Sequence, residues 1–129
     1  MKIAALIART LLGLMFVVFG SNAFLHFIPM QPPPGEAGAF LGALFSSGYF
    51  SAIAVFEILG GLLLLSGYFV PLGLTLIGPV IVNIVFFHLF LEPKGLPTAI
   101  VVSLLSLVVL YYHRASFAGL VMAKSQDSF

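Results

Sequence analysis

Residues 49–69 read YFSAIAVFEILGGLLLLSGYF, a stretch long and apolar enough to cross a lipid bilayer as a helix. A membrane-spanning helix needs about 20 predominantly apolar residues. Glu57 is the one ionisable side chain that would lie inside this helix. An ionised group at mid-helix costs roughly 2.5 to 3.5 kcal/mol on insertion scales, so such residues usually serve a function. Glu57 is therefore the first candidate functional residue.

The helical period predicts which way Glu57 points, because residues three, four and seven positions apart share one face. The face of Glu57 includes Ala54, Gly60, Gly61, Leu64 and Tyr68. Small residues are preferred where helices pack against each other in membranes. We therefore expect Glu57 to point into a helix bundle rather than toward lipid.

Composition places the whole chain in the membrane class. Hydrophobic residues make up 61% of its 129 residues and charged residues only 7%, which is far from the composition of a soluble domain. The formal net charge of +1 gives no support for nucleic-acid binding, and the lack of cysteine excludes disulfides and thiolate-bound metals or clusters. A chain of this length has room for one domain of about four spans.

Proline-rich breaks divide the chain into these spans. MQPPPGE follows the first apolar stretch, Val70 and Pro71 form a short turn after the second, and EPKGLP at 92–97 precedes the last. The sequence thus predicts an all-α, four-transmembrane-helix bundle forming a single domain, 1–129, with both termini on the same side. Its predicted spans are about 3–27, 49–69, 72–91 and 97–113.

A shorter helix is expected between the first two spans, at about 36–47. Its apolar face carries Ala37, Phe40, Leu41, Leu44 and Phe45 at helical spacing. It is too short to span the membrane, so we expect it to lie in the interface. A plain surface loop and a lid over the bundle are the two alternatives for this segment.

Flanking charges predict the orientation, since lysine and arginine concentrate in cytoplasmic segments. Lys2 and Arg9 lie near the start, and Arg114 and Lys124 follow the last span, whereas the opposite side has only Lys94. Both termini of this multi-pass protein are therefore expected in the cytoplasm.

A cleaved signal peptide ending near 21–23 is the alternative interpretation of the N-terminus. Arg9 is expected to extend its charge to the cytoplasmic surface.

Polar side chains on the four spans fall at similar predicted depths in the outer half of the bundle. Counting from the predicted helix ends places Glu57 and Asn83 each ~12 Å from the outer surface, with Pro79 one turn from Asn83. The other candidates in this half are Asn22, His26, His88, Ser103 and Ser106. This cluster predicts a site for a small hydrophobic ligand.

In the structural alternative, Glu57 and the asparagines hydrogen-bond between helices, and His88 pairs with Glu92 one turn later. No close-spaced ligand motif supports a haem or metal site, and no catalytic residue is predicted.

Two segments, ARTLLGLMFVVFGSNAF and FEILGGLLLLSGYFVPLGLTLIGPVIVNIVFFHLFLEP, resemble the DoxX-like family of small bacterial four-helix membrane proteins. The most specific part is Glu57-x-x-Gly60-Gly61, followed by the turn Pro71-Leu72-Gly73. The resemblance implies a bacterial cytoplasmic (inner) membrane location. It also implies a quinone-linked redox role, since the family name comes from a small subunit associated with thiosulfate:quinone oxidoreductase. Lysine is frequent in the family near the end of the first span, where this chain has Asn22, Ala23 and His26.

Three classes of function remain open, and the sequence does not decide whether the protein is an enzyme. The favoured class binds a quinone or a lipid at the polar cluster. A redox-accessory protein would bind a quinone there beside a partner membrane or redox subunit, because the chain shows no electron carrier of its own. An assembly or interaction protein would use its outer surface, and the polar cluster would be structural.

Overall fold

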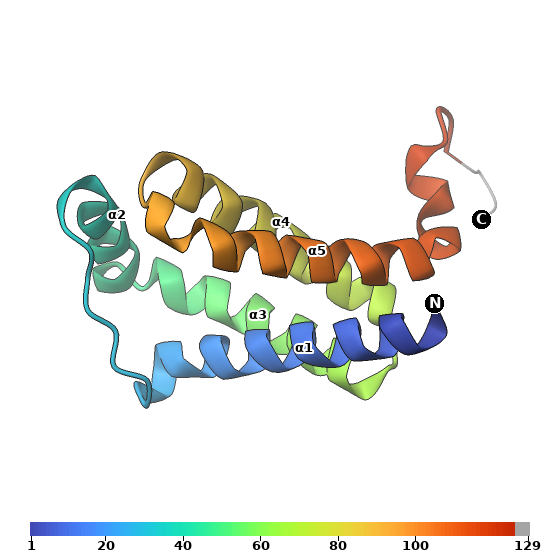
Figure 1. Ribbon diagram of the computed structural model, residues 1–129, viewed down its shortest axis with the longest axis horizontal. Coiled ribbons are helices and arrows are strands. Elements are labelled where there is room, and N and C mark those ends of the chain that lie inside the picture. Colours follow the sequence, from blue (N-terminus) through green and yellow to red (C-terminus); the bar gives the residue numbers. More distant parts are fainter. Residues whose placement is uncertain (126–129) are drawn as a thin grey trace.

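The computed structural model describes residues 1–125, and residues 126–129 of the predicted domain lie outside the described part. It is all-α (Figure 1). Four helices are long and apolar enough to cross a membrane, which confirms the predicted fold class. The elements are α1 (Lys2–Leu25), α2 (Gly35–Ser46), α3 (Tyr49–Ser66), α4 (Val70–Phe90), the 3-10 turn η1 (Pro93–Gly95), α5 (Leu96–Tyr112) and the 3-10 segment η2 (Arg114–Val121).

The four long helices form a bundle in which each packs against two others. Helices α1 and α4 each contact both α3 and α5. Neighbouring long helices run in opposite directions, so the start of α1 and the segment η2 lie at one end of the bundle (Figure 1). The short helix α2 and the turn η1 lie at the other end. The chain therefore begins and leaves its last span at the same end, as the four-span pattern predicts.

Glycines determine how closely α3 approaches its neighbours. A Cβ added to Gly61 would lie 2.8 Å from the carbonyl oxygen of Gly13 in α1, and a Cβ added to Gly73 in α4 would lie 3.0 Å from the carbonyl oxygen of Gly60. Consecutive helix residues differ by about 100° in direction. Gly60 and Gly61 thus allow close contact with α4 and α1 respectively.

The core is built from one set of apolar side chains per span. The largest fully buried ones are Leu12, Leu64, Ile77 and Val109, which come from α1, α3, α4 and α5 in turn. Many other large apolar side chains face outward. In a membrane these outward residues contact lipid, so their exposure is the expected arrangement.

The structure corrects two predicted boundaries. Helix α1 ends at Leu25 rather than 27, with His26 in the left-handed conformation as its C-cap. The turn after α3 lies at residues 67–69, and α4 begins at Val70. Pro71 therefore belongs to the first turn of α4, where a missing N–H costs nothing because that N–H has no helical partner. Tyr68 lies in the turn and is exposed, not on the inner face of Glu57.

Arg9 also differs from its predicted role. Its guanidinium donates hydrogen bonds to the carbonyl oxygens of Leu64 and Leu65, close to the C-terminal end of α3. The last carbonyls of a helix have no partner within it, and a cation is favourable there. Arg9 thus joins α1 to the end of α3 instead of extending freely to the surface.

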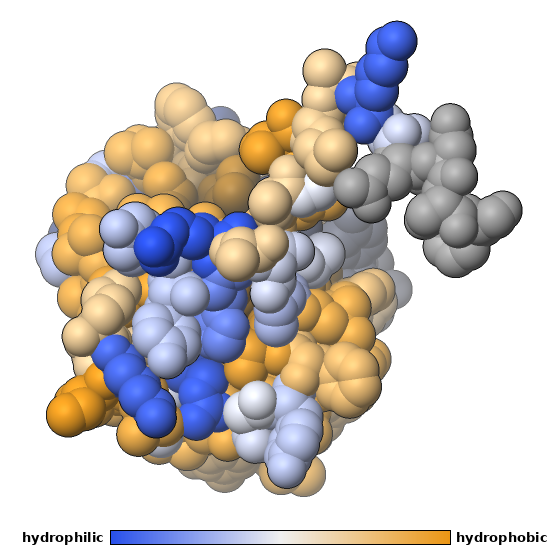
Figure 2. All heavy atoms as spheres, turned by 90° about the vertical axis from the view of Figure 1, so that its right-hand side faces the viewer, coloured by the Kyte–Doolittle hydropathy of each residue, from blue (hydrophilic) through white to orange (hydrophobic). Residues whose placement is uncertain are grey.

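The end of the molecule that carries the chain start is polar at its centre and apolar around it (Figure 2). A small depression of about 190 Å³ there is lined by Lys2, Arg9, Tyr112 and His113 among others. A polar end face bordered by apolar sides is the distribution expected where a helical bundle leaves the hydrocarbon layer.

Candidate functional site

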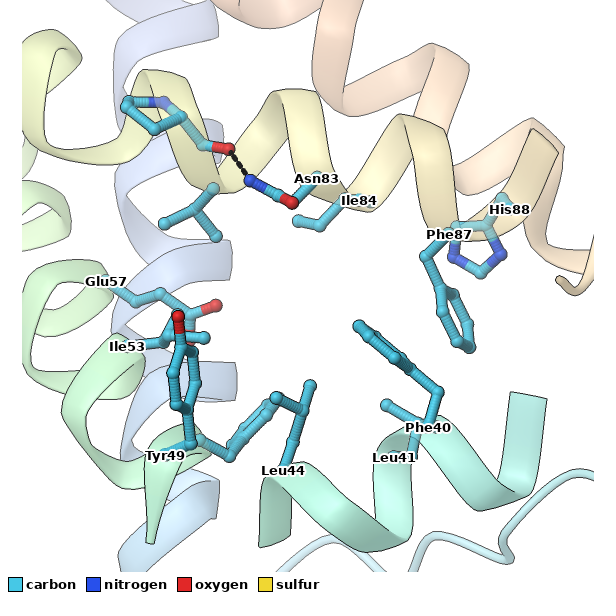
Figure 3. A pocket seen from close by; sticks show the side chains of 13 residues that line it. Phe40, Leu41, Leu44, Tyr49, Ile53, Glu57, Asn83, Ile84, Phe87 and His88 are labelled. Carbon is cyan, nitrogen blue, oxygen red and sulfur yellow. Dashed lines mark hydrogen bonds between the residues drawn. The ribbon is translucent and has the colours of Figure 1, made fainter. Parts of the chain in front are cut away.

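A cavity of about 520 Å³ lies between α2, α3 and α4, beside Glu57 (Figure 3). Small-molecule sites in proteins typically occupy about 300 to 1,000 Å³. The cavity lies toward the end of the bundle opposite the chain start, since its walls include the beginning of α3 and the end of α4. It is lined by Phe40, Leu41, Leu44, Tyr49, Phe50, Ile53, Glu57, Pro79, Val80, Asn83, Ile84, Phe87 and His88.

Helix α2 forms one wall of this cavity. The ring of Phe40 lies 5.9 Å from the ring of Phe87 on α4, measured between centroids. Near the C-terminal end of α2, the ring of Phe45 stacks on that of Phe50 on α3, with centroids 4.4 Å apart. The short helix therefore reaches both long helices and covers the space between them.

Glu57 is buried, with a relative exposure of 7%, so the predicted inward orientation is confirmed. Within residues 1–125 its carboxyl group makes no hydrogen bond. In the same residues no fully buried side-chain nitrogen or oxygen lacks a partner. The carboxyl oxygens must therefore be reached from the cavity, toward which they point in Figure 3. Glu57 is not the interhelical hydrogen-bonding residue of the structural alternative.

Asn83 lies on the opposite wall, on α4. Its Nδ2 donates a hydrogen bond to the carbonyl oxygen of Pro79, one turn back along the same helix, at 2.8 Å. Figure 3 shows the side-chain oxygen facing the open space across from Glu57. The structure thus brings together the two residues that the sequence predicts at equal depth, without a bond between them.

His88, near the end of α4, lines the cavity, and its ring contacts Glu92 in the segment that follows α4. Its Nδ1 lies 3.0 Å from the carbonyl oxygen of Glu92 and 3.5 Å from the carboxylate of the same residue. The predicted pairing of His88 with Glu92 is therefore confirmed. Because a carbonyl oxygen only accepts, a hydrogen bond at this position requires a proton on Nδ1.

Asn22, His26, Ser103 and Ser106 do not line the cavity, so the structure does not bring together a polar group from every span there. Asn22 accepts from the backbone N–H of Ile28 at 2.7 Å and donates to its carbonyl at 3.3 Å. Ser103 and Ser106 donate to carbonyls of their own helix, at 2.8 and 2.7 Å. Short polar side chains readily form hydrogen bonds with nearby backbone groups in this way. His26 is exposed at the end of α1.

The aromatic walls of the site were not predicted from the sequence; they are formed by Phe40, Tyr49, Phe50 and Phe87. A usable signal was present on the third span. Pro79, Asn83 and Phe87 are spaced by four residues, which places them on one face of a helix. The four-residue spacing within α4 does not predict that α2 packs over that face.

Comparison with known proteins adds no assignment. No family model, no curated protein and no solved structure matches this chain. Within residues 1–125, no three His, Cys, Asp or Glu side chains gather as they would around a metal ion. The cavity beside Glu57 is therefore the feature from which a function can be inferred.

Proposed function

We propose that this membrane protein binds a small hydrophobic ligand, a quinone or a lipid, in the cavity between α2, α3 and α4. The observation that carries the proposal is the Glu57 carboxyl group, which opens onto an apolar cavity without a hydrogen-bond partner among residues 1–125. Ligand sites typically combine apolar and aromatic walls with a few placed polar groups.

Energetics support a ligand-binding role for Glu57. A buried polar group without a partner costs about 1 to 3 kcal/mol, and more when the group is charged. A ligand head group that hydrogen-bonds the carboxyl would offset this cost, while the walls accept an apolar body. A purely structural glutamate would be expected to bond a neighbouring helix.

The association with a quinone-linked redox system is an extension of this proposal, supported by the resemblance to the DoxX-like family. A partner membrane or redox subunit would then carry the electrons. With both termini in the cytoplasm of a bacterial inner membrane, as the flanking charges favour, the cavity would lie in the outer half of the bilayer.

Native mass spectrometry of the protein released from nanodiscs tests the proposal, with extraction and identification of any co-purified molecule. Wild type is compared with Glu57→Ala and with the matched control Glu36→Ala. Glu36 lies in the first turn of α2, is exposed and does not line the cavity. We expect a quinone or lipid on wild type and on the control, and its loss from Glu57→Ala.

Two results would contradict the proposal. The first is an equal ligand content in all three proteins. The second is a wild type that carries no small molecule but retains a partner polypeptide, which would favour the assembly or interaction function. Circular dichroism and melting of each variant in detergent separate loss of ligand from loss of fold.

A further inference from the structure

We infer that the cavity selects a ligand whose head group donates hydrogen bonds, namely a hydroxylated aromatic ring such as a hydroquinone on an apolar tail. This inference rests on the proposed function and narrows its ligand class. It predicts that the reduced, hydroxyl-bearing form of a quinone binds better than the oxidised, carbonyl-bearing form.

Asn83 presents a hydrogen-bond acceptor to the cavity. The amide nitrogen alone can donate to the carbonyl oxygen of Pro79, so that 2.8 Å bond fixes which end of the carboxamide faces the helix. The other end, the oxygen Oδ1, is left facing the cavity (Figure 3). It can only accept a hydrogen bond.

Glu57 presents oxygen from the opposite wall. Its two carboxyl oxygens have no hydrogen-bond donor among residues 1–125 and are open to the cavity. An ionised carboxylate accepts hydrogen bonds only, and a protonated one adds a single O–H donor while it keeps acceptor sites. In either state, the Glu57 and Asn83 side chains offer more acceptor positions to a ligand than donors.

The remaining lining residues add few hydrogen-bond donors, so acceptors stay in excess. Pro79 has no N–H, and the Nδ1–H of His88 is directed to Glu92. Past the first turn of each helix, the N–H groups of the walls are used by the helices themselves. At the start of α3, the N–H of Tyr49 donates to the hydroxyl of Ser47. The Tyr49 hydroxyl can donate or accept. A ligand head that brings its own O–H groups therefore suits this cavity better than one that brings only carbonyls.

The walls of the cavity are mainly aromatic and aliphatic. The aromatic side chains of Phe40, Tyr49, Phe50 and Phe87 line the space, together with the aliphatic side chains of Leu41, Leu44, Ile53 and Ile84. Aromatic side chains favour offset or edge contacts with another ring. A planar ring is thus favoured over a branched polar head group.

A matched ligand series tests the inference: a short-tailed benzoquinol, its benzoquinone and its dimethyl ether, all with the same ring and tail. Binding to wild type in nanodiscs is measured by calorimetry, with the quinol kept under anaerobic conditions. We expect the quinol to bind about tenfold more tightly than the other two, since one or two net hydrogen bonds distinguish them.

Variants locate the selectivity. Asn83→Leu removes one acceptor and should reduce the preference for the quinol severalfold. Glu57→Gln introduces amide donors and should shift the preference toward the quinone. Ser103→Ala is the control, because Ser103 lies outside the cavity and bonds its own helix, and it should retain the wild-type ratio.

Equal or tighter binding of the quinone by wild type would overturn the inference and leave the proposed function standing, because the cavity would still bind a ligand. Failure to bind any of the three compounds would also overturn it. If none of the three compounds binds, a lipid that depends on Glu57 in the native mass spectrum would still support the proposed function. If no such lipid is present either, both the inference and the proposed function are contradicted. The wild-type ratio decides the inference even if a variant fails to fold.

Discussion

Gly60 and Gly61 show how two neighbouring residues can support two different helix contacts. Gly60 faces the backbone of Gly73, and Gly61 faces the backbone of Gly13. Helix association in membranes gains little from the hydrophobic effect and depends on such close packing. Glu57 lies one turn before this pair, so the glycines also hold its helix in position beside the cavity.

Gly61→Ala should destabilise the bundle, because its Cβ would lie 2.8 Å from a backbone oxygen that cannot move alone. Overpacking of this kind costs about 1 to 3 kcal/mol. The measurement is the melting temperature in detergent. Gly78→Ala is the control, since nothing lies within 4 Å of a Cβ at that position. Equal melting temperatures for the two variants would contradict the close contact.

His113, just beyond α5, gives a pH-dependent prediction. Burial, and then the charge of Arg9, lower the pKa of its imidazole below the ordinary value of 6.5. Lys2 and Arg9 of α1 line the same small surface hollow as His113. As the pH falls below 6.5, the unfolded chain takes up the proton first, so the stability present above 6.5 is lost progressively until the folded pKa is reached.

We therefore expect the melting temperature of wild type to fall as the pH is lowered through this window, and to fall less in His113→Gln. Melting curves at several pH values in the same detergent measure the two slopes. Parallel slopes for wild type and variant would show that His113 makes no contribution.

At the scale of single elements, the end of α1 is determined by local backbone bonds. His26 adopts a φ of 53° as the C-cap, and its N–H donates to the carbonyl of Asn22. Asn22 in turn bonds both backbone groups of Ile28. These contacts give the two residues a role in ending α1, away from the cavity.

His26→Gly should stabilise this end by up to about 1 kcal/mol, because glycine adopts the left-handed conformation without a steric cost. His26→Val should destabilise it, since a β-branched residue is poorly suited to positive φ. Both variants should retain the cavity ligand in native mass spectra. Loss of the ligand from His26→Gly would return His26 to the binding site.

At the scale of the whole molecule, the antiparallel order of the four spans places η1 and η2 at opposite ends (Figure 1). The positive-inside rule predicts that the end with Lys2 and Arg114 faces the cytoplasm. Because the chain has no native cysteine, single introduced cysteines can report on this orientation without background.

We expect Lys94→Cys in η1 to react with a membrane-impermeant maleimide from outside intact spheroplasts, and Ser116→Cys in η2 to react only after permeabilisation. Both residues are exposed, so accessibility alone does not distinguish them. The reverse pattern would invert the proposed orientation and place the cavity in the inner half of the bilayer.

The sequence by itself determined the membrane class, the four spans, the short helix after the first of them, and the inward face of Glu57. These properties are local: hydropathy, prolines and the 3.6-residue period act within one segment. Helix ends were less well predicted, because Pro71 can either break a helix or begin one.

The tertiary structure alone decided which polar groups meet. Arg9 bonds a carbonyl 55 residues away. Asn22 and the two serines hydrogen-bond nearby backbone groups. Of the seven site residues predicted from the sequence, all within residues 1–125, Glu57, Asn83 and His88 line the cavity. The reason is that equal depth along the helices does not specify their order around the bundle or the position of α2. That order depends on glycine contacts between segments, and it leaves Glu57 facing open space beneath α2.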